Sequence, residues 1–273
     1  MYRGKHTHQE RGRSKKHSSG ALVLLLTTVL LVGGVVGGTV AWLIADTDPV
    51  VNTFTYGDIN LKLEETETDE KGTPFDKNGD GDLKTSTGNE YEMVPGEEYL
   101  KDPVVTVLEG NEACWLFVKL VEEGGVPIPN ADGTITTYDF DSYLTYDVLV
   151  KDENTDGWLQ LIGDDGNAVE GIYFRQVGED TDGIKVSYEV LKGNKISVKD
   201  TVTKDMLNAL DNNGQDTEAT TYPKLSITAY AVQYNGFEPE VSDEAAEPTA
   251  DQLNAAALKA WKAVEAENAT ATS

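Results

Sequence analysis

The sequence predicts an all-β protein, a jelly-roll-like antiparallel β-sandwich with short helical insertions and a C-terminal amphipathic helix. Between residues 58 and 237, runs of alternating apolar and polar residues recur, which is the pattern of half-buried strands. Turn dipeptides separate these runs, including Asp132-Gly133 and Asp165-Gly166. Many strands with frequent turns and little helix are typical of two-layered antiparallel folds.

The strands can be placed in order along the chain. Residues 59–63 alternate cleanly, and residues 103–108 form the next strong run. Residues 113–121 are apolar at nearly every position, as expected for a strand with both faces buried. Further strands are expected at 144–150, 184–190 and 225–231, where every second residue is apolar.

Two segments have helical rather than strand periodicity. Residues 203–211 place three apolar side chains on one side of a short helix. Residues 250–273 are expected to form a C-terminal helix and tail, behind an acidic linker at 238–249 that contains two prolines. Thr249 and Gln252 have the spacing of a capping box. The apolar stripe of this helix is expected to dock on the sandwich, or alternatively on another subunit; it comprises Leu253, Ala257, Leu258, Trp261 and Val264.

Residues 1–41 have the pattern of a signal peptide. A basic segment precedes an uncharged, largely apolar run from residue 21 to residue 45, and small residues lie near the end of this run. Thr39 and Ala41 fit the positions before a cleavage site, so we expect a signal peptidase to cut between Ala41 and Trp42. The alternative is an uncleaved anchor, because the run is long enough to span a bilayer. Both predict a protein that is secreted or held at the cell surface.

The charge is strongly acidic, and its distribution excludes several functions. Of 22 basic and 48 acidic residues, residues 1–41 hold six bases and one acid, which leaves 16 bases, 47 acids and a net charge of −31 for residues 42–273. Nucleic-acid binding requires clustered Lys and Arg, so we expect no nucleic-acid partner. All three histidines precede residue 18, so the mature chain has no histidine for a catalytic triad or an HExxH zinc site.

We find no pattern that predicts an enzyme. The only cysteine, Cys114, lies in an apolar run and has no histidine to activate it, so we expect a buried small hydrophobe. The chain has no phosphate-binding loop motif and no dinucleotide-binding motif. Acidic pairs carry little information in a chain with this many carboxylates.

One loop has the pattern of a weak calcium site. Side-chain oxygens stand at the first, third, fifth and seventh positions of a calcium-loop pattern, at Asp76, Asn78, Asp80 and Asp82. Gly81 stands at the sixth position, where such loops turn sharply. The twelfth position is Thr87 instead of the bidentate glutamate, so the alternative is an acidic loop facing solvent. We expect no other cofactor.

Three segments occur in a distinctive order behind the signal peptide. Residues 52–63 read NTFTYGDINLKL, residues 93–97 read MVPGE, and residues 227–237 read ITAYAVQYNGF. In this order they resemble the TasA/camelysin family of secreted biofilm-matrix fibre proteins, which a dedicated signal peptidase releases. The matching segments bracket nearly the whole sandwich. The calcium-like loop, Pro49 and the C-terminal helix lie outside the family's pattern.

The resemblance implies a structural protein that forms fibres by donor-strand exchange. The N-terminal segment of one subunit, here residues 42–57, would complete a sheet in the next subunit, in fibres of this chain alone or with other matrix proteins. Its expected apolar anchors are Trp42, Leu43, Ile44, Val50, Val51 and Phe54. Pro49 has no N–H group, so it should face away from the acceptor strand or interrupt the pairing. The alternatives are a strand that folds back on its own subunit, and a monomeric surface adhesin or binding module.

The large negative charge should also affect assembly. Acidic subunits repel one another at low ionic strength, and salt or divalent cations screen this repulsion. We therefore expect calcium to promote assembly, either diffusely or through the loop at Asp76.

Overall fold

The structure is a computed structural model that describes residues 42–43, 55–56 and 59–271, apart from 78, 87, 130–131, 180, 214–221 and 242–246. The chain divides into two compact units, residues 1–40 and 41–273, and the description concerns the second. Several predicted features lie outside the described residues: the signal peptide with Ala41, the donor residues Ile44, Val50, Val51 and Phe54, and Asn78 of the calcium-like loop. Within the part described, no helix has the length and apolar character needed to cross a membrane.

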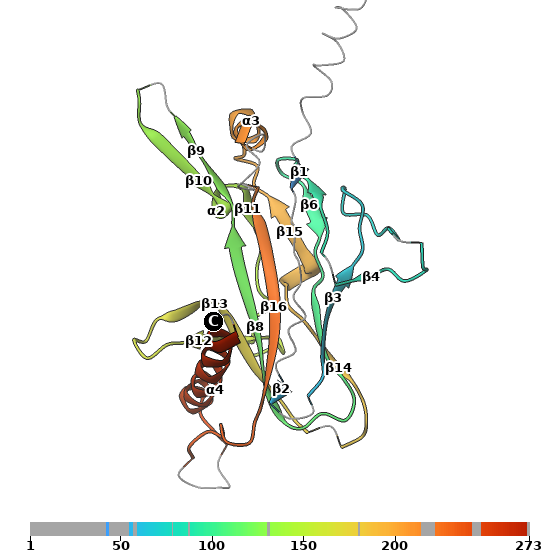
Figure 1. The fold of residues 1–273 in the computed structure, drawn as a ribbon, viewed down its shortest axis with the longest axis vertical. Helices are drawn as coiled ribbons and strands as arrows, with labels where there is room; N and C mark the ends of the chain where they lie inside the picture. Colours follow the sequence, from blue (N-terminus) through green and yellow to red (C-terminus); the bar gives the residue numbers. More distant parts are fainter. Residues whose placement is uncertain are drawn as a thin grey trace, which may run out of the picture. The chain divides into compact units, whose positions relative to one another are not determined.

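Two sheets form the body of the fold (Figure 1). The larger sheet has, in spatial order, β12 (Leu159–Ile162), β13 (Ala168–Val177), β8 (Cys114–Glu123), β16 (Lys224–Gln233) and β2 (Thr55–Tyr56). The second has β14 (Val186–Glu189), β7 (Val104–Val107), β3 (Leu61–Thr66) and β4 (Lys84–Thr85). Every pairing is antiparallel except that of β2 with β16. The predicted all-β sandwich is confirmed.

Smaller elements extend the two main sheets. A three-stranded sheet contains β11 (Leu144–Thr145), β15 (Lys195–Val198) and β6 (Glu98–Leu100). Two pairs of strands complete the set: β1 (Trp42–Leu43) with β5 (Tyr91–Glu92), and β9 (Gly125–Pro129) with β10 (Ile135–Asp139). The helices are α2 (Phe140–Tyr143), the single turn η1 (Lys192–Asn194), α3 (Lys204–Asn213) and α4 (Ala250–Ala271).

One predicted strand is wrong in extent. The alternation over 144–150 continues for four apolar residues, but the regular strand ends at Thr145. Val148 and Val150 make only single bridge pairs, with Leu191 and Trp158 respectively. The reason is that this segment passes from one neighbour to another, so its side chains alternate while its backbone never follows a single partner strand.

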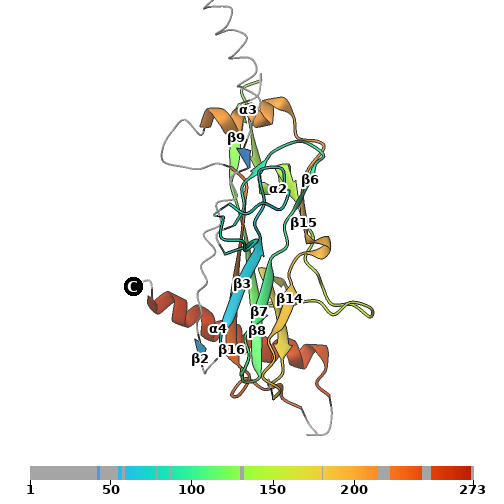
Figure 2. The same ribbon diagram turned by 90° about the vertical axis from the view of Figure 1, so that its right-hand side faces the viewer.

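The main core lies between the two sheets. Figure 2 shows β3, β7 and β14 in front of β8 and β16. The odd-numbered side chains of β16 from Leu225 to Ala231 face this core, and so do Leu61 and Leu63 of β3. Burying each large apolar side chain contributes roughly 1.5–3 kcal/mol. The alternation that predicts these strands therefore reflects packing in this core.

The helix α4 forms a second core on the opposite face of the larger sheet (Figure 1). Trp261 packs on Phe117 and Tyr230, with ring centroids 5.3 and 5.5 Å away. The predicted docking of the helix on the sandwich is confirmed. The capping box is also present, because the Thr249 N–H donates to Oε1 of Gln252 at 2.8 Å and the Gln252 N–H donates to Oγ1 of Thr249 at 3.3 Å.

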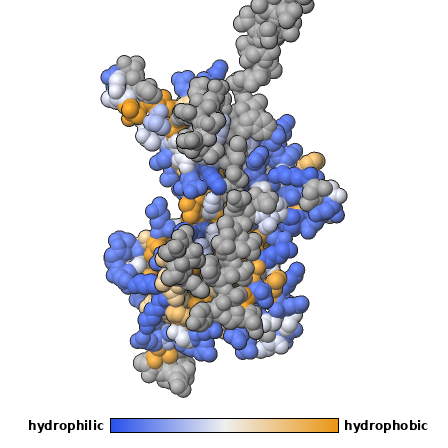
Figure 3. Space-filling view, in the orientation of Figure 1, coloured by the Kyte–Doolittle hydropathy of each residue, from blue (hydrophilic) through white to orange (hydrophobic). Residues whose placement is uncertain are grey.

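The hairpin of β9 and β10 extends beyond the sheets. Gly124, between β8 and β9, has φ +94°, and a Cβ there would lie 2.2 Å from the carbonyl oxygen of Tyr222. A glycine is therefore required where the chain leaves β8. Figure 3 shows a largely hydrophilic face with an apolar patch on this hairpin, where Ile135 is 66% exposed.

A buried ion pair crosses from β3 to the segment between β6 and β7. Nζ of Lys101 lies 2.7 Å from Oε2 of Glu65, and their side chains are only 3% and 7% exposed. Asn89 donates to Oε1 of Glu65 at 2.9 Å and accepts from the Thr68 N–H at 2.8 Å. Charges are buried in proteins when they are paired and hydrogen-bonded, and this cluster meets both conditions.

We predict that Lys101→Ala lowers the free energy of unfolding by about 3–5 kcal/mol, because it leaves the Glu65 carboxylate buried without its partner. Urea unfolding measures this loss. The double variant Glu65→Leu/Lys101→Met should recover most of it, since no charge is then buried. Lys195→Ala is the control, because its partner Glu98 is 58% exposed and the loss there should stay below about 1 kcal/mol. An equal loss in both single variants would contradict the prediction.

Candidate functional site

The feature that points to a function is the outer edge of β16. On one side β16 pairs with β8 over its whole length, from Lys224 opposite Glu123 to Gln233 opposite Cys114. On the other side, the described part of the chain pairs with it only through β2, at Ala231 and Val232. Residues 224–230 of β16 therefore have no described strand beside them on that side.

The hydrogen-bond pattern shows which backbone groups point to this edge. The Tyr234 N–H donates to the Ala113 carbonyl oxygen at 2.7 Å, one step beyond the end of the β8–β16 ladder. Hydrogen-bonded pairs recur every second residue in an antiparallel ladder, so the even-numbered residues of β16 bond to β8. The N–H and C=O groups of Leu225, Ile227 and Ala229 then point to the outer edge. Such a row of groups is a template for another strand.

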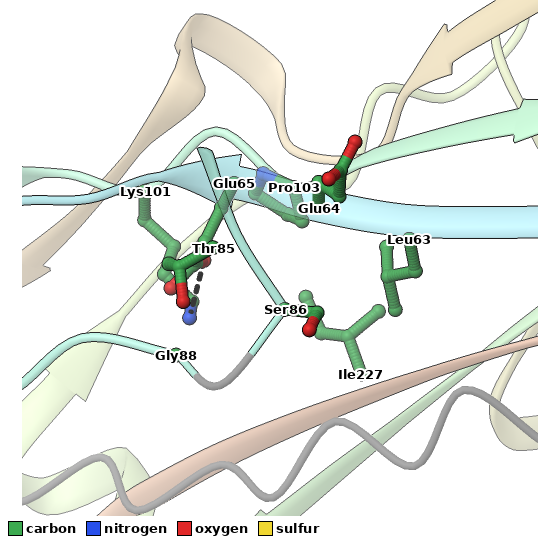
Figure 4. A pocket seen from close by; sticks show the side chains of 9 residues that line it. All are labelled: Leu63, Glu64, Glu65, Thr85, Ser86, Gly88, Lys101, Pro103 and Ile227. Carbon is green, nitrogen blue, oxygen red and sulfur yellow. Dashed lines mark ion pairs between the residues drawn. The ribbon is translucent and has the colours of Figure 1, made fainter. Parts of the chain in front are cut away.

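A cavity lies between the two sheets near this edge (Figure 4). Leu63 of β3 and Ile227 of β16 extend toward one another in it. The buried pair of Glu65 and Lys101 closes one end. The other described lining residues are Glu64, Thr85, Ser86, Gly88 and Pro103. The surface of the cavity is thus mainly apolar, and Ile227 is the residue that β16 contributes to its described lining.

The opposite edge of the same sheet is closed by a side chain. Asn254 of α4 accepts from the Ile162 N–H through Oδ1 and donates to the Ile162 carbonyl oxygen through Nδ2, both at 2.9 Å. The amide group therefore makes the two bonds that a neighbouring strand would make with this residue of β12. Covering an edge in this way prevents further strand pairing. Among the described residues, the larger sheet thus has one edge covered at β12, and at β16 an edge that pairs only with β2.

The described ends of the predicted donor segment pair within their own chain. Trp42 and Leu43 lie opposite Glu92 and Tyr91 in β5, and β2 runs parallel to β16. This arrangement at the two ends is what a strand folded back on its own subunit would show. Donor-strand exchange itself stays a prediction, because its central residues lie outside the described part.

The calcium-like loop is held by its own carboxylates. Asp76 accepts from the Gly79 N–H at 2.6 Å and from the Gly81 N–H at 2.9 Å, while Asp80 accepts from the Asp82 N–H at 2.7 Å. In the part of the chain that the structure describes, no three His, Cys, Asp or Glu side chains are grouped as metal ligands. Calcium binding at this loop stays a prediction.

The lone cysteine is buried, as predicted. Cys114 has no exposed surface, and this burial raises the pKa of its thiol to about 12. The thiolate is the reactive form of cysteine, so this side chain is poorly suited to act as a nucleophile at neutral pH.

Sequence patterns did not identify two features that define this site, the cavity and the covered edge of β12. Leu63 and Ile227 are recognisable as inward-facing strand residues, but nothing in the sequence shows that they line one cavity. Asn254 lies in the helix beside the predicted apolar stripe, and its pairing with Ile162 has no local signal. Both depend on contacts between distant parts of the chain.

Comparisons with known proteins do not identify a family. No protein-family model, curated protein or solved structure matches the chain. The resemblance to the TasA/camelysin family therefore rests on the three sequence motifs alone.

We predict that Asn254→Ala exposes the backbone of β12 and increases lateral association. It should also lower the free energy of unfolding by about 1–3 kcal/mol, since the Ile162 groups lose both partners. Light scattering and urea unfolding measure the two effects. Lys259→Ala, on the same helix, is the control because Lys259 pairs with an exposed glutamate, Glu240. Unchanged scattering by Asn254→Ala would contradict the edge-covering role.

Proposed function

We propose that this chain is a secreted structural protein, a subunit of extracellular matrix fibres. In the proposed assembly, residues 42–57 of one subunit add to the outer edge of β16 in the next. The observation that carries the proposal is the row of β16 backbone groups without a described partner, beside an apolar cavity. Main-chain hydrogen bonds supply affinity in such strand addition, and alternate side chains in pockets supply specificity.

The pairing of β1 and β2 within the chain is compatible with this proposal. Exchange of an identical element between subunits replaces internal contacts with the same contacts between copies. A subunit that completes its own sheet would be a soluble precursor, and a subunit that accepts the strand of a neighbour would be a fibre member. Each exchange leaves one donor and one acceptor free at the two ends, so the contact is head-to-tail and can continue as a filament.

The pairing of β1 and β2 within the chain also supports a second possible function. If residues 42–57 stay on their own subunit, the protein is a monomeric adhesin or binding module, either released or held at the surface by an uncleaved N-terminus. The observation in favour is that both described pieces of this segment pair internally. The two functions differ in whether the mature protein polymerises.

We predict that residues 42–273 form fibres and that residues 55–273 do not, because the second protein lacks the donor strand. Electron microscopy and sedimentation velocity measure this, and circular dichroism checks that both proteins are folded. A third protein, with residues 42–54 in scrambled order, keeps the length and charge and serves as the matched control. It should also fail to form fibres.

Two results would contradict the proposal. If all three proteins are folded and monodisperse, this chain does not polymerise by itself, and the surface module becomes the better description. If the truncated or scrambled protein forms the same fibres, the contact between subunits lies elsewhere.

We also propose that calcium promotes this assembly, because the mature chain carries a net charge of −31 by the count given above. We predict an earlier onset of polymerisation in millimolar calcium than in chelator, measured by light scattering. Weak extracellular sites have dissociation constants of about 10⁻⁴–10⁻³ M. Asp76→Ala should remove the part of the effect that exceeds magnesium at equal concentration. An onset that calcium does not change would contradict this idea.

A further inference from the structure

We propose that Lys101 and Asn89 form an isopeptide bond within the chain, with Glu65 as the catalytic acid and base. The reaction takes place inside one subunit, so it does not depend on the function proposed above. The three side chains come from separate segments: Glu65 from β3, Asn89 from between β4 and β5, and Lys101 from between β6 and β7. They supply a nucleophilic amine, a carboxylate that can carry protons, and a carboxamide.

The carboxylate of Glu65 contacts both of the nitrogen atoms that take part. Its Oε2 atom lies 2.7 Å from Nζ of Lys101, and its Oε1 atom accepts from Nδ2 of Asn89 at 2.9 Å. Both distances are within the range for direct proton transfer. One carboxylate therefore bridges the attacking amine and the leaving nitrogen. Figure 4 shows the pair of Lys101 and Glu65 beside the cavity.

The amide oxygen of Asn89 is held by two donors. The Thr68 N–H donates to Oδ1 at 2.8 Å, and Nζ of Lys77 donates to it at 3.3 Å. Nδ2 also donates to the Thr66 carbonyl oxygen at 2.8 Å, so the amide is fixed in this orientation. Negative charge develops on Oδ1 when an amine attacks Cγ. Donors that are already in place stabilise such a charge, as in an oxyanion hole.

The site is shielded from water. The side chains of Lys101 and Glu65 are 3% and 7% exposed, and Asn89 is 1% exposed. Burial disfavours the charged forms of both an amine and a carboxylate, so transfer of a proton from Lys101 to Glu65 leaves two neutral groups. The neutral amine is the form that attacks a carbonyl carbon. The burial of the pair thus prepares the nucleophile.

The reaction needs no oxidant and no co-reactant. Lys101 gives one proton to Glu65, and its nitrogen forms a bond to Cγ of Asn89. The attacking nitrogen gives a second proton through Glu65 to Nδ2, the bond from Cγ to Nδ2 breaks, and ammonia leaves. An ammonium and a carboxylate become an amide and a neutral carboxylic acid, so no charge stays buried. The neighbouring cavity has a volume of about 20 Å³, enough for one molecule the size of water or ammonia.

The bond gives this chain a cross-link that its cysteine content does not allow. Cys114 is the only cysteine, so the chain cannot form an internal disulfide. The isopeptide bond closes a ring from residue 89 to residue 101, which contains β5 and β6. Such a link restricts the unfolded chain as a disulfide does, but reducing conditions do not break it. The free energies predicted above for the Lys101 variants refer to the chain in which this bond has not formed.

Intact-mass spectrometry of the purified, folded protein tests the bond. We expect a mass about 17 Da below that of the sequence, because one ammonia is lost. Four glutamates lie between the two linked residues: Glu90, Glu92, Glu97 and Glu98. After a protease cuts at these glutamates, the fragments that contain Asn89 and Lys101 stay joined only if the two side chains are linked. The full sequence mass after prolonged incubation would overturn the proposal.

Variants distinguish the cross-link from other losses of ammonia. Lys101→Met removes the nucleophile and should keep its full sequence mass. A loss that persists in this variant would come from a cyclic imide at Asn89 and would overturn the proposal. Glu65→Gln keeps the shape of the side chain but removes the base, and the linked fraction should fall by about tenfold or more. Lys195→Ala, which removes the exposed pair with Glu98, is the control and should link like the parent protein.

Lys77 tests which lysine reacts. Its side chain contacts the amide oxygen rather than the bridging carboxylate, and the residue is exposed. Lys77→Met should therefore link more slowly but at the same residues, Asn89 and Lys101. A link to Lys77 in the parent protein would overturn the assignment of the nucleophile. Circular dichroism checks that each variant is folded, and the mass of the parent protein decides the proposal even where a variant is not.

Discussion

The pairing of β8 with β16 is the interaction on which the rest of this structure depends. Both strands have ten residues and pair at every position, so they form one wall shared by two cores. Alternate side chains of β16 face the main core and the α4 side. This alternation requires that β16 keeps one register along its length, which the ladder to β8 ensures. The same ladder uses half of the backbone groups of β16 and directs the other half to the outer edge.

The two edge strands of the larger sheet differ in what covers their outer backbone groups, so the sheet is asymmetric. At β12, the side chain of Asn254 occupies the edge from α4, so the helix that forms the second core also covers a strand. At β16, the described contacts end with the short strand β2. A sheet with two free edges would add strands on both sides and grow laterally. Under the proposed function, a sheet with one usable edge would accept one strand, which would restrict assembly to a single direction.

Much of the sandwich follows from the sequence because its strands bury alternate residues in one core. Leu61 and Leu63, and the odd-numbered residues of β16, show this period directly. Prediction was less successful in segments where the pattern of buried side chains does not match the pattern of strand pairing. The 144–150 segment alternates but changes partners, and the β9–β10 hairpin has mostly partly buried or exposed residues, so only its Asp132-Gly133 turn was visible. The site at β16 depends on contacts between Leu63 and Ile227, which no local pattern specifies.

The acidity of residues 42–273 would have a physical role in the proposed assembly. An apolar groove beside an edge strand is a general hazard, because any extended segment with apolar residues can add to it. Strong mutual repulsion disfavours unspecific association between subunits at low ionic strength. In the proposed assembly, a correctly placed donor strand would offset that repulsion through its main-chain hydrogen bonds, and contacts elsewhere would not. Under the proposed function, the charge would oppose association in general while the strand contact supplies specificity, so linear growth would be favoured over aggregation.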